Sequence, residues 1–169
     1  PSYSGPAIKL GAGVQAYQAY EAAHEAGYRV TGGTCPTVGL AGGYTQGGGH
    51  GALSSLYGLG ADNVLEWEVV TPKGEHIVTS PQNHSDLHWA LSGGGGGTFG
   101  VVISMTAKLH KDGPTSGGYL SFSTSSAGVS AFWDVIEEFQ GGLGPLVDSG
   151  AVALYQITNT NFLSIFTAP

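Results

Sequence analysis

The sequence predicts an α+β protein built from short antiparallel strands and two main helices. Residues 14–26 place small and apolar side chains at helical spacing, with glutamine and glutamate on the other side. From Val64 onward apolar residues alternate with glutamates, and a Pro-Lys-Gly-Glu turn leads into a returning strand at 76–79, which makes an antiparallel hairpin. Residues 129–139 repeat apolar side chains at i, i+3, i+4, i+7 and i+10, which is the pattern of an amphipathic helix.

The other N-terminal elements flank the first helix. Residues 7–10 are expected to form a short strand that ends in a Gly-Ala-Gly turn, and Gly27 is expected to end the helix. A second short strand is expected at residues 28–31. Residues 32–60 have no clear hydrophobic period, so we predict a loop there.

Two further elements follow the hairpin. Ser85 or Asp86 is expected to cap a short helix that runs through Leu91. Residues 99–109 are rich in β-forming side chains and predict a strand. One face of this strand is expected to carry the side chains of Val101, Ile103, Met105 and Ala107.

A strong breaker, Asp112-Gly113-Pro114, divides the chain. We therefore expect a first domain at 1–112 and a second at 113–169. In the second, strands at 119–124 and 151–158 surround the amphipathic helix. Its 57 residues, from 113 to 169, look like the start of an incomplete domain.

Glycine dominates the composition. Of 169 residues, 30 are glycine, or about 18% against an average of about 7%. No G-X-Y period is present, which excludes collagen, and the 41% hydrophobic content argues against a disordered chain. Because the glycines gather at 39–51 and 93–97, we expect backbone to approach a ligand closely there.

The charge and the cysteine content limit the classes of partner and of structure that this chain can have. The net charge is −7 and no basic run occurs, so a nucleic-acid partner is excluded. No apolar stretch is long enough to span a membrane, and the single cysteine, Cys35, excludes an internal disulfide. The sequon Asn83-His84-Ser85 is compatible with glycosylation in a secreted protein. The chain opens on Pro1 without an initiator Met, and we interpret it as a mature or internal fragment.

Three patterns in the sequence bear on nucleotide binding. Residues 11–16 fit G-x-G-x-x-A, but no acid follows the strand at 28–31 to hold a ribose, so a Rossmann site is disfavoured. A phosphate-binding P-loop is excluded because no Gly-Lys-Ser/Thr occurs. The third pattern is the glycine-rich stretch 34–51, which leaves most of a loop without side chains. The backbone N–H groups of that loop can therefore approach a flat anionic ligand directly. From spacing alone, Cys35 before this loop is either a small buried hydrophobe or a nucleophile.

Several strings carry a resemblance to a known family. They are Gly-Thr-Cys-Pro-Thr-Val-Gly at 33–39, Gly-Gly at 42–43, Gly-Gly-Gly-x-Gly at 47–51, Tyr-Gly-Leu-Gly-Ala-Asp-Asn-Val at 57–64, Asp-Leu-x-Trp-Ala-Leu at 86–91, five glycines at 93–97 and Phe-Gly-Val-Val at 99–102. Together they resemble the FAD-linked oxidases of the vanillyl-alcohol oxidase superfamily, in the berberine-bridge-enzyme-like branch and with a fungal-like composition. The resemblance covers roughly residues 1–110. It implies the second half of a PCMH-type FAD-binding domain, followed by the start of a substrate domain of antiparallel sheet plus helices.

The resemblance also implies a mechanism and a site. A cysteine at the position of Cys35 bonds C6 of the flavin ring, while a histidine elsewhere bonds the 8α-methyl. An alcohol or amine-type substrate gives hydride to this bicovalent FAD, and O2 reoxidises the flavin to yield H2O2. The loop backbone would lie along the ring and pyrophosphate, and 100–102 would approach the adenine. The implied cofactor contacts are Cys35, Thr34, Pro36, Thr37, Val38, Gly39, Gly42, Gly43, Tyr44, Gly48, Gly49, His50, Gly51, Gly100, Val101 and Val102.

Other parts of the family pattern fall outside this chain. The flavin-linked histidine belongs to an upstream segment, and the catalytic base is expected in later strands. His84 and His88 lie four residues apart but have no third ligand nearby, so we predict exposed helix residues and no metal site. Tyr155 and Gln156, on the first strand pair of the substrate domain, are candidates for a substrate pocket.

We therefore expect a secreted FAD-linked oxidase fragment, glycosylated at Asn83. Its partners would be a small-molecule substrate, O2 and the remaining N- and C-terminal segments of the same enzyme, without which we expect no activity. Two alternatives stay open: a flavin dehydrogenase of the same fold, and a non-catalytic, allergen-like protein with a relic flavin site.

Overall fold

The computed structural model describes residues 3–168 and divides into two compact units, Pro1–Asp112 and Gly113–Pro169. The division falls at the Asp-Gly-Pro breaker. No helix among the described residues is long and apolar enough to cross a bilayer.

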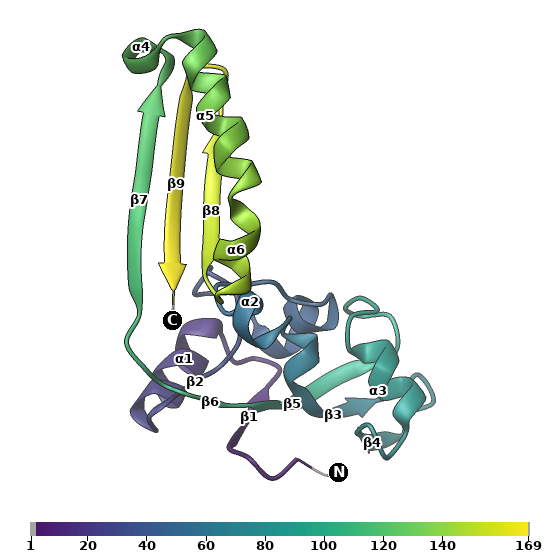
Figure 1. The fold of residues 1–169 in the computed structure, drawn as a ribbon. Helices are drawn as coiled ribbons and strands as arrows, with labels where there is room; N and C mark the ends of the chain where they lie inside the picture. Colours follow the sequence, from purple (N-terminus) through teal and green to yellow (C-terminus); the bar gives the residue numbers. More distant parts are fainter. Residues whose placement is uncertain (1–2, 169) are drawn as a thin grey trace. The chain divides into compact units, whose positions relative to one another are not determined.

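The first unit is a four-stranded antiparallel sheet with helices (Figure 1). Its elements are β1 (Ala7–Gly11), α1 (Ala16–Glu25), β2 (Tyr28–Arg29), a π-helical turn (Leu40–Tyr44), α2 (Ser54–Tyr57), a 3-10 turn (Ala61–Asn63), β3 (Val64–Val70), β4 (His76–Thr79), α3 (Ser85–Leu91), β5 (Val101–Lys108) and β6 (His110–Lys111). The sheet order is β1-β5-β3-β4, and β2 pairs separately with β6. The helix at 14–26 and the hairpin at 64–79 are confirmed, with ends shifted by up to two residues.

The core of this unit lies between the sheet and its helices. The small face of α1, formed by Ala16, Ala19 and Ala23, is fully buried, because alanine lets a helix approach a sheet closely. Trp67 of β3 is also fully buried, and its indole N–H donates to the Ser92 hydroxyl at 3.0 Å, just beyond α3. Leu40 and Leu91 belong to the same buried cluster.

The prediction of one continuous face on β5 was wrong. Residue pairing between β3 and β5 skips Ile103, between Glu68↔Ser104 and Val69↔Val102. Such a bulge adds one residue to one strand and reverses which side chains point inward. Met105 and Ala107 therefore remain buried, while Val101 is 66% exposed and Val102 takes the buried side.

Three smaller expectations in this unit also need correction. Residues 32–60 are not all loop, because they contain the π-helical turn and α2. The residue that precedes α3 is His84, in the left-handed conformation, and neither Ser85 nor Asp86 caps it. His88 is buried rather than exposed, since it faces Thr79 beneath α3, and burial lowers its pKa. No group of three potential metal ligands occurs among the described residues.

A polar network crosses all four strands. Glu68 of β3 accepts bonds from Lys9 of β1 at 2.8 Å and Ser104 of β5 at 2.5 Å, and it contacts His76 of β4 at 2.9 Å. These hydrogen bonds lower the pKa of Glu68 from 4.5 to about 2. The bond from Lys9 contributes most, followed by those from Ser104 and His76.

This network predicts a pH dependence of stability. A carboxylate whose pKa is lowered by folding stabilises the protein above its unfolded pKa, and this contribution disappears as the pH falls from about 4.5 to about 2. Glu68→Gln should therefore flatten the free energy of unfolding across that window and leave its slope above pH 5 unchanged. Denaturant titrations at a series of pH values measure this, and an unchanged acid slope in the variant would contradict it.

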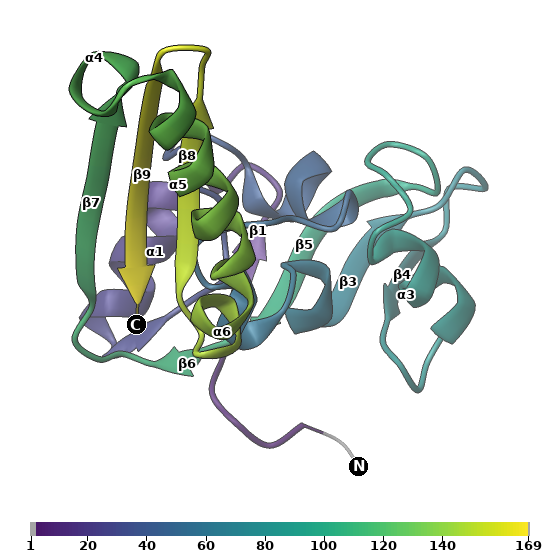
Figure 2. The ribbon, with the colours of Figure 1, turned by 45° about the horizontal axis from the view of Figure 1, so that its top comes forward.

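The second unit is a three-stranded sheet with helices (Figures 1 and 2). Its elements are β7 (Ser116–Ser123), α4 (Thr124–Ala127), α5 (Val129–Gly141), α6 (Leu143–Asp148), β8 (Val152–Ile157) and β9 (Asn161–Ala168), in the sheet order β7-β9-β8. The central strand β9 was not predicted. Helix α5 is confirmed; it buries Phe132 and Ile136 against Phe162 of β9, while Trp133 remains 45% exposed.

The sheet of the second unit leaves its other face open. Alternate side chains on β9 place Leu163 and Ile165 away from α5, and both are exposed. Gln156 pairs with Leu163 and shares this open face, whereas the neighbouring Tyr155 packs toward Phe139 of α5 with ring centroids 5.3 Å apart. The two substrate-pocket candidates thus point to opposite faces of the sheet.

Candidate functional site

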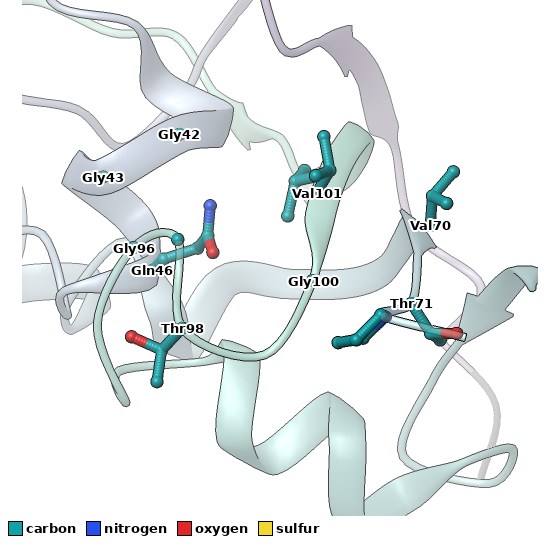
Figure 3. A pocket seen from close by; sticks show the side chains of 12 residues that line it. Gly42, Gly43, Gln46, Val70, Thr71, Gly96, Thr98, Gly100 and Val101 are labelled. Atoms are coloured by element: carbon teal, nitrogen blue, oxygen red, sulfur yellow. The ribbon is translucent and has the colours of Figure 1, made fainter. Parts of the chain in front are cut away.

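A cavity of about 660 Å³ lies in the first unit, between two glycine-rich segments and the β3–β4 turn (Figure 3). Its volume is within the usual range for small-molecule sites. The residues that line it are Gly42, Gly43, Gln46, Val70, Thr71, Pro72, Gly96, Gly97, Thr98, Gly100, Val101 and Val102.

The two glycine-rich segments are joined directly. The backbone N–H of Gly95 donates to the carbonyl of Gln46 at 2.8 Å. A Cβ on Gly96 would lie 2.9 Å from the Cα of Gly43, closer than real Cβ contacts allow. Gly100 is packed as closely, because a Cβ added there would lie 2.9 Å from the carbonyl oxygen of Val70. These close approaches need glycine, and they set the width of the cavity.

Gly42 and Gly43 differ from the other loop glycines. A Cβ at either position would meet nothing within 4 Å, and both line the cavity. Neither has a positive φ. Packing within this unit does not explain why Gly43 lacks a side chain, whereas a ligand in the cavity would. This is the close backbone approach that the clustering predicts.

Several glycines in and around the first segment serve internal packing around Tyr44. Its ring lies where a Cβ on Gly49 would stand, and it also lies against the Cβ positions of Gly33 and Gly60. Gly51 is held against the carbonyl of Gly32. Burial raises the pKa of Tyr44, which therefore stays neutral, and its half-buried ring is not among the residues lining the cavity.

Tyr20 supports the same region from α1. Its hydroxyl donates to the carbonyl of Gly33 at 2.5 Å. Burial, with a smaller contribution from Tyr44, raises the pKa of Tyr20 to about 12. Both phenols are thus structural and protonated at neutral pH.

The cysteine lies in an exposed turn that α1 holds in place. Val38 and Pro36 accept bonds from the N–H groups of Ala16 and Tyr17, at 2.8 and 2.9 Å, at the start of the helix. Cys35 is a free thiol, exposed, and 3.8 Å from the hydroxyl of Thr37. The prediction left open a buried hydrophobe or a nucleophile, and exposure excludes the buried hydrophobe.

The hydrogen bonds at the start of α1 also argue against a Rossmann site. A dinucleotide pyrophosphate would need the free N–H groups at the start of α1. Those of Ala16 and Tyr17 already donate to the cysteine turn. Moreover, β1 pairs antiparallel with β5, and no strand pair in the described sheets is parallel, so there is no βαβ unit.

The structure brings only part of the predicted contact set together at the cavity. Gly42, Gly43, Gly100, Val101 and Val102 line it. The cysteine turn, Gly39, Tyr44 and the segment Gly48–Gly51, in which His50 is exposed, do not. The sequence prediction missed the β3–β4 turn, because turn residues carry no binding signal of their own. It also missed Gln46, a polar residue embedded in a glycine run, which was an available signal.

The cavity fits a flavin nucleotide on two grounds. The open positions at Gly42 and Gly43 form a cradle that side chains would fill. The buried amide oxygen of Gln46, which lines the cavity, has no hydrogen-bond partner within the protein. Since no lysine or arginine lines the cavity, any phosphate there would rely on backbone N–H groups.

Comparison with known proteins agrees with this geometry. Residues 4–80 match the FAD binding domain family. A VAO-type flavoprotein oxidase of Thermothelomyces thermophilus is 54% identical over 169 residues, all of this chain and 29% of that protein. An FAD-linked oxidoreductase of Gibberella zeae is 57% identical over 162 residues, 96% of this chain and 29% of that protein.

Solved structures agree as well. The crystal structure of a VAO-type flavoprotein from Myceliophthora thermophila C1 superposes with a TM-score of 0.97 at 54% identity, over all of this chain and 31% of that one. A variant of berberine bridge enzyme, at 24% identity and TM-score 0.81 over 95% of this chain and 32% of its own, shares the fold.

Residues 4–80 are thus matched to an FAD-binding domain of the PCMH type. The chain as a whole is similar to VAO-type flavoproteins, and it spans about 29% of the length of the relatives described above.

Proposed function

We propose that this chain is part of an FAD-dependent oxidase that acts on a small alcohol or amine-type organic substrate. When bound, FAD accepts a hydride from the substrate, and O2 reoxidises it to give H2O2. The observation that carries the proposal is the cradle at Gly42 and Gly43, open within a domain of the FAD-binding family. Purified full-length enzyme should reduce its flavin anaerobically with substrate and form H2O2 when air is admitted.

The chain's own residues would hold and shield the cofactor. Gly42, Gly43 and Gly96 let backbone approach the nucleotide, and Val101 with Pro72 supplies an apolar wall that excludes water. Gln156, on the open face of the second sheet, is retained as a candidate for the substrate pocket. Tyr155 is a weaker candidate because its ring packs toward α5.

We propose that Cys35 bonds the flavin covalently: its Sγ would replace the hydrogen on C6 of the ring, and the two electrons released would pass into the flavin and on to O2, with a histidine outside this chain making a second link. The proposal is supported by the exposed thiol on a turn that two helix N–H groups fix in place. A fixed, exposed thiol can react at one position of a ring, whereas a buried one cannot.

Covalent attachment predicts a mass signature. In the full-length protein, peptides that contain Cys35 should be joined through one FAD to the histidine-linked peptide, and Cys35→Ala should remove this cross-link while FAD stays attached through the histidine. Ser125→Ala, at an exposed position on α4, is the matched control and should leave the attachment intact. An unmodified Cys35 peptide in flavin-loaded protein would overturn this part of the proposal.

We further propose that the enzyme is secreted and glycosylated at Asn83, and that it is complete only with its remaining N- and C-terminal segments. Asn83 is exposed, and its side-chain N–H donates to the carbonyl of Val78 at 2.8 Å. Peptide mapping of protein from a culture supernatant reports this glycan alongside the flavin.

A further inference from the structure

Gln46 joins the two glycine-rich segments and is buried beside the cavity. It follows the π-helical turn, and 4% of the residue is exposed. Its backbone carbonyl accepts from Gly95, and its side chain reaches the cavity between Gly96 and Val101 (Figure 3). A polar side chain buried this deeply normally has every hydrogen-bonding atom paired.

Only one end of the amide is paired. The Nε2 group donates to the carbonyl of Ala41 at 3.4 Å, whereas Oε1 has no partner. The carbonyl of Ala41 requires a donor, so this contact fixes which end of the amide is nitrogen. The free end is therefore an acceptor. An unpaired buried acceptor is energetically unfavourable, so a hydrogen-bond donor bound in the cavity would be stabilised by it.

A purely structural role does not explain the residue. Support of Ala41 accounts for Nε2, and the bond from Gly95 uses only the backbone, which any residue offers. Because Nε2 is held by the carbonyl of Ala41, Oε1 is the end of the amide that remains for a ligand in the cavity. Phosphate oxygens are acceptors and would not satisfy it.

We propose that Gln46 is a cofactor-binding residue whose Oε1 accepts a hydrogen bond from a hydroxyl or amino group of FAD, and that it does not contact the pyrophosphate. The inference rests on the proposed function. It assigns the glycine end of the cavity to a sugar or base of the nucleotide.

The test uses full-length protein produced without flavin, with binding measured by quenching of FAD fluorescence. Gln46→Met keeps the length and volume of the side chain but removes the acceptor, and it should weaken FAD binding about tenfold. Gln140→Met, at an exposed position on α5, is the matched control and should bind FAD like the wild type. Inorganic pyrophosphate, tested as a competitor, should bind wild type and Gln46→Met equally.

Two fragments locate the donor. If it belongs to the adenosine half, Gln46→Met should weaken competition by ADP and not by riboflavin; if it belongs to the ribityl chain or ring, the reverse holds. Either result supports the inference. Equal FAD affinity of Gln46→Met and wild type, or weaker pyrophosphate binding by the variant, would overturn it.

A second variant distinguishes loss of the hydrogen-bond acceptor from misfolding. In Gln46→Glu, a protonated carboxyl can donate to Ala41 and still accept from the ligand, so FAD binding should approach the wild-type affinity at low pH. A carboxyl accepts a hydrogen bond in both of its protonation states, so Gln46→Glu should bind FAD more tightly than Gln46→Met. At low pH, an affinity of Gln46→Glu no better than that of Gln46→Met would contradict the inference. Failure of the wild type to bind FAD at all would instead refute the proposed function, so the two failures are distinguishable.

Discussion

Gly43→Leu should weaken FAD binding about 100-fold while the protein stays folded. A Cβ at this position meets no protein atom within 4 Å, so the new side chain starts in open space and we expect the packing of the domain to be kept. It projects into the cavity and takes space that the cofactor would occupy, and overpacking of this size opposes binding by about 3 kcal/mol. Isothermal titration of full-length, flavin-free protein with FAD measures the effect.

Gly13→Leu is the matched control for this variant. Gly13 also has open space at its Cβ position and no positive φ, but it lies outside the cavity. It should bind FAD with wild-type affinity. Equal affinities for the Gly43 and Gly13 variants would mean that the cavity does not hold the cofactor.

Gly51→Ala should destabilise the fold by about 3 kcal/mol or more. Its Cβ would collide with the backbone carbonyl of Gly32, and backbone cannot swing aside as a flexible side chain can. A typical domain is stable by only about 5–15 kcal/mol, so much of the protein should be lost to aggregation. Soluble yield and the midpoint of urea unfolding measure this, with Gly13→Ala as the control.

The two glycine variants should thus fail in different ways. The Gly43 variant should stay folded and lose the ligand, whereas the Gly51 variant should lose the fold. If Gly51→Ala unfolded at the same urea concentration as wild type, the close approach of residues 32 and 51 would not exist in solution. The glycines of one loop therefore divide into those that make room for a ligand and those that let the chain pack on itself.

Local patterns predicted the elements whose two faces differ. Helix α1 and strand β3 each carry apolar side chains on one side and polar ones on the other, so their periods are visible. Strand β9 was missed because Phe162 and Phe166 pack toward α5 while Leu163 and Ile165 line the open face, so both faces are apolar and no alternation appears.

Long-range pairing set what the sequence could not reveal. The bulge at Ile103 arises from its register with β3, and it moved Val101 outward to the cavity wall. Pro72 reaches the same cavity from a hairpin turn whose sequence predicts only a turn. The glycine motifs predicted the correct loops. Whether a given glycine makes room for a ligand or lets the chain pack on itself depends on which backbone lies opposite it in the fold.

Hydrogen–deuterium exchange of the full-length protein, without flavin and with FAD bound, tests the central claim most directly. The central claim is that FAD occupies the cavity between the two glycine-rich segments. Bound FAD should slow amide exchange in peptides covering residues 42–46 and 96–102 and leave residues 16–25 of α1 unchanged. FAD-bound protein in which both glycine segments exchange as fast as in the flavin-free form would contradict the account.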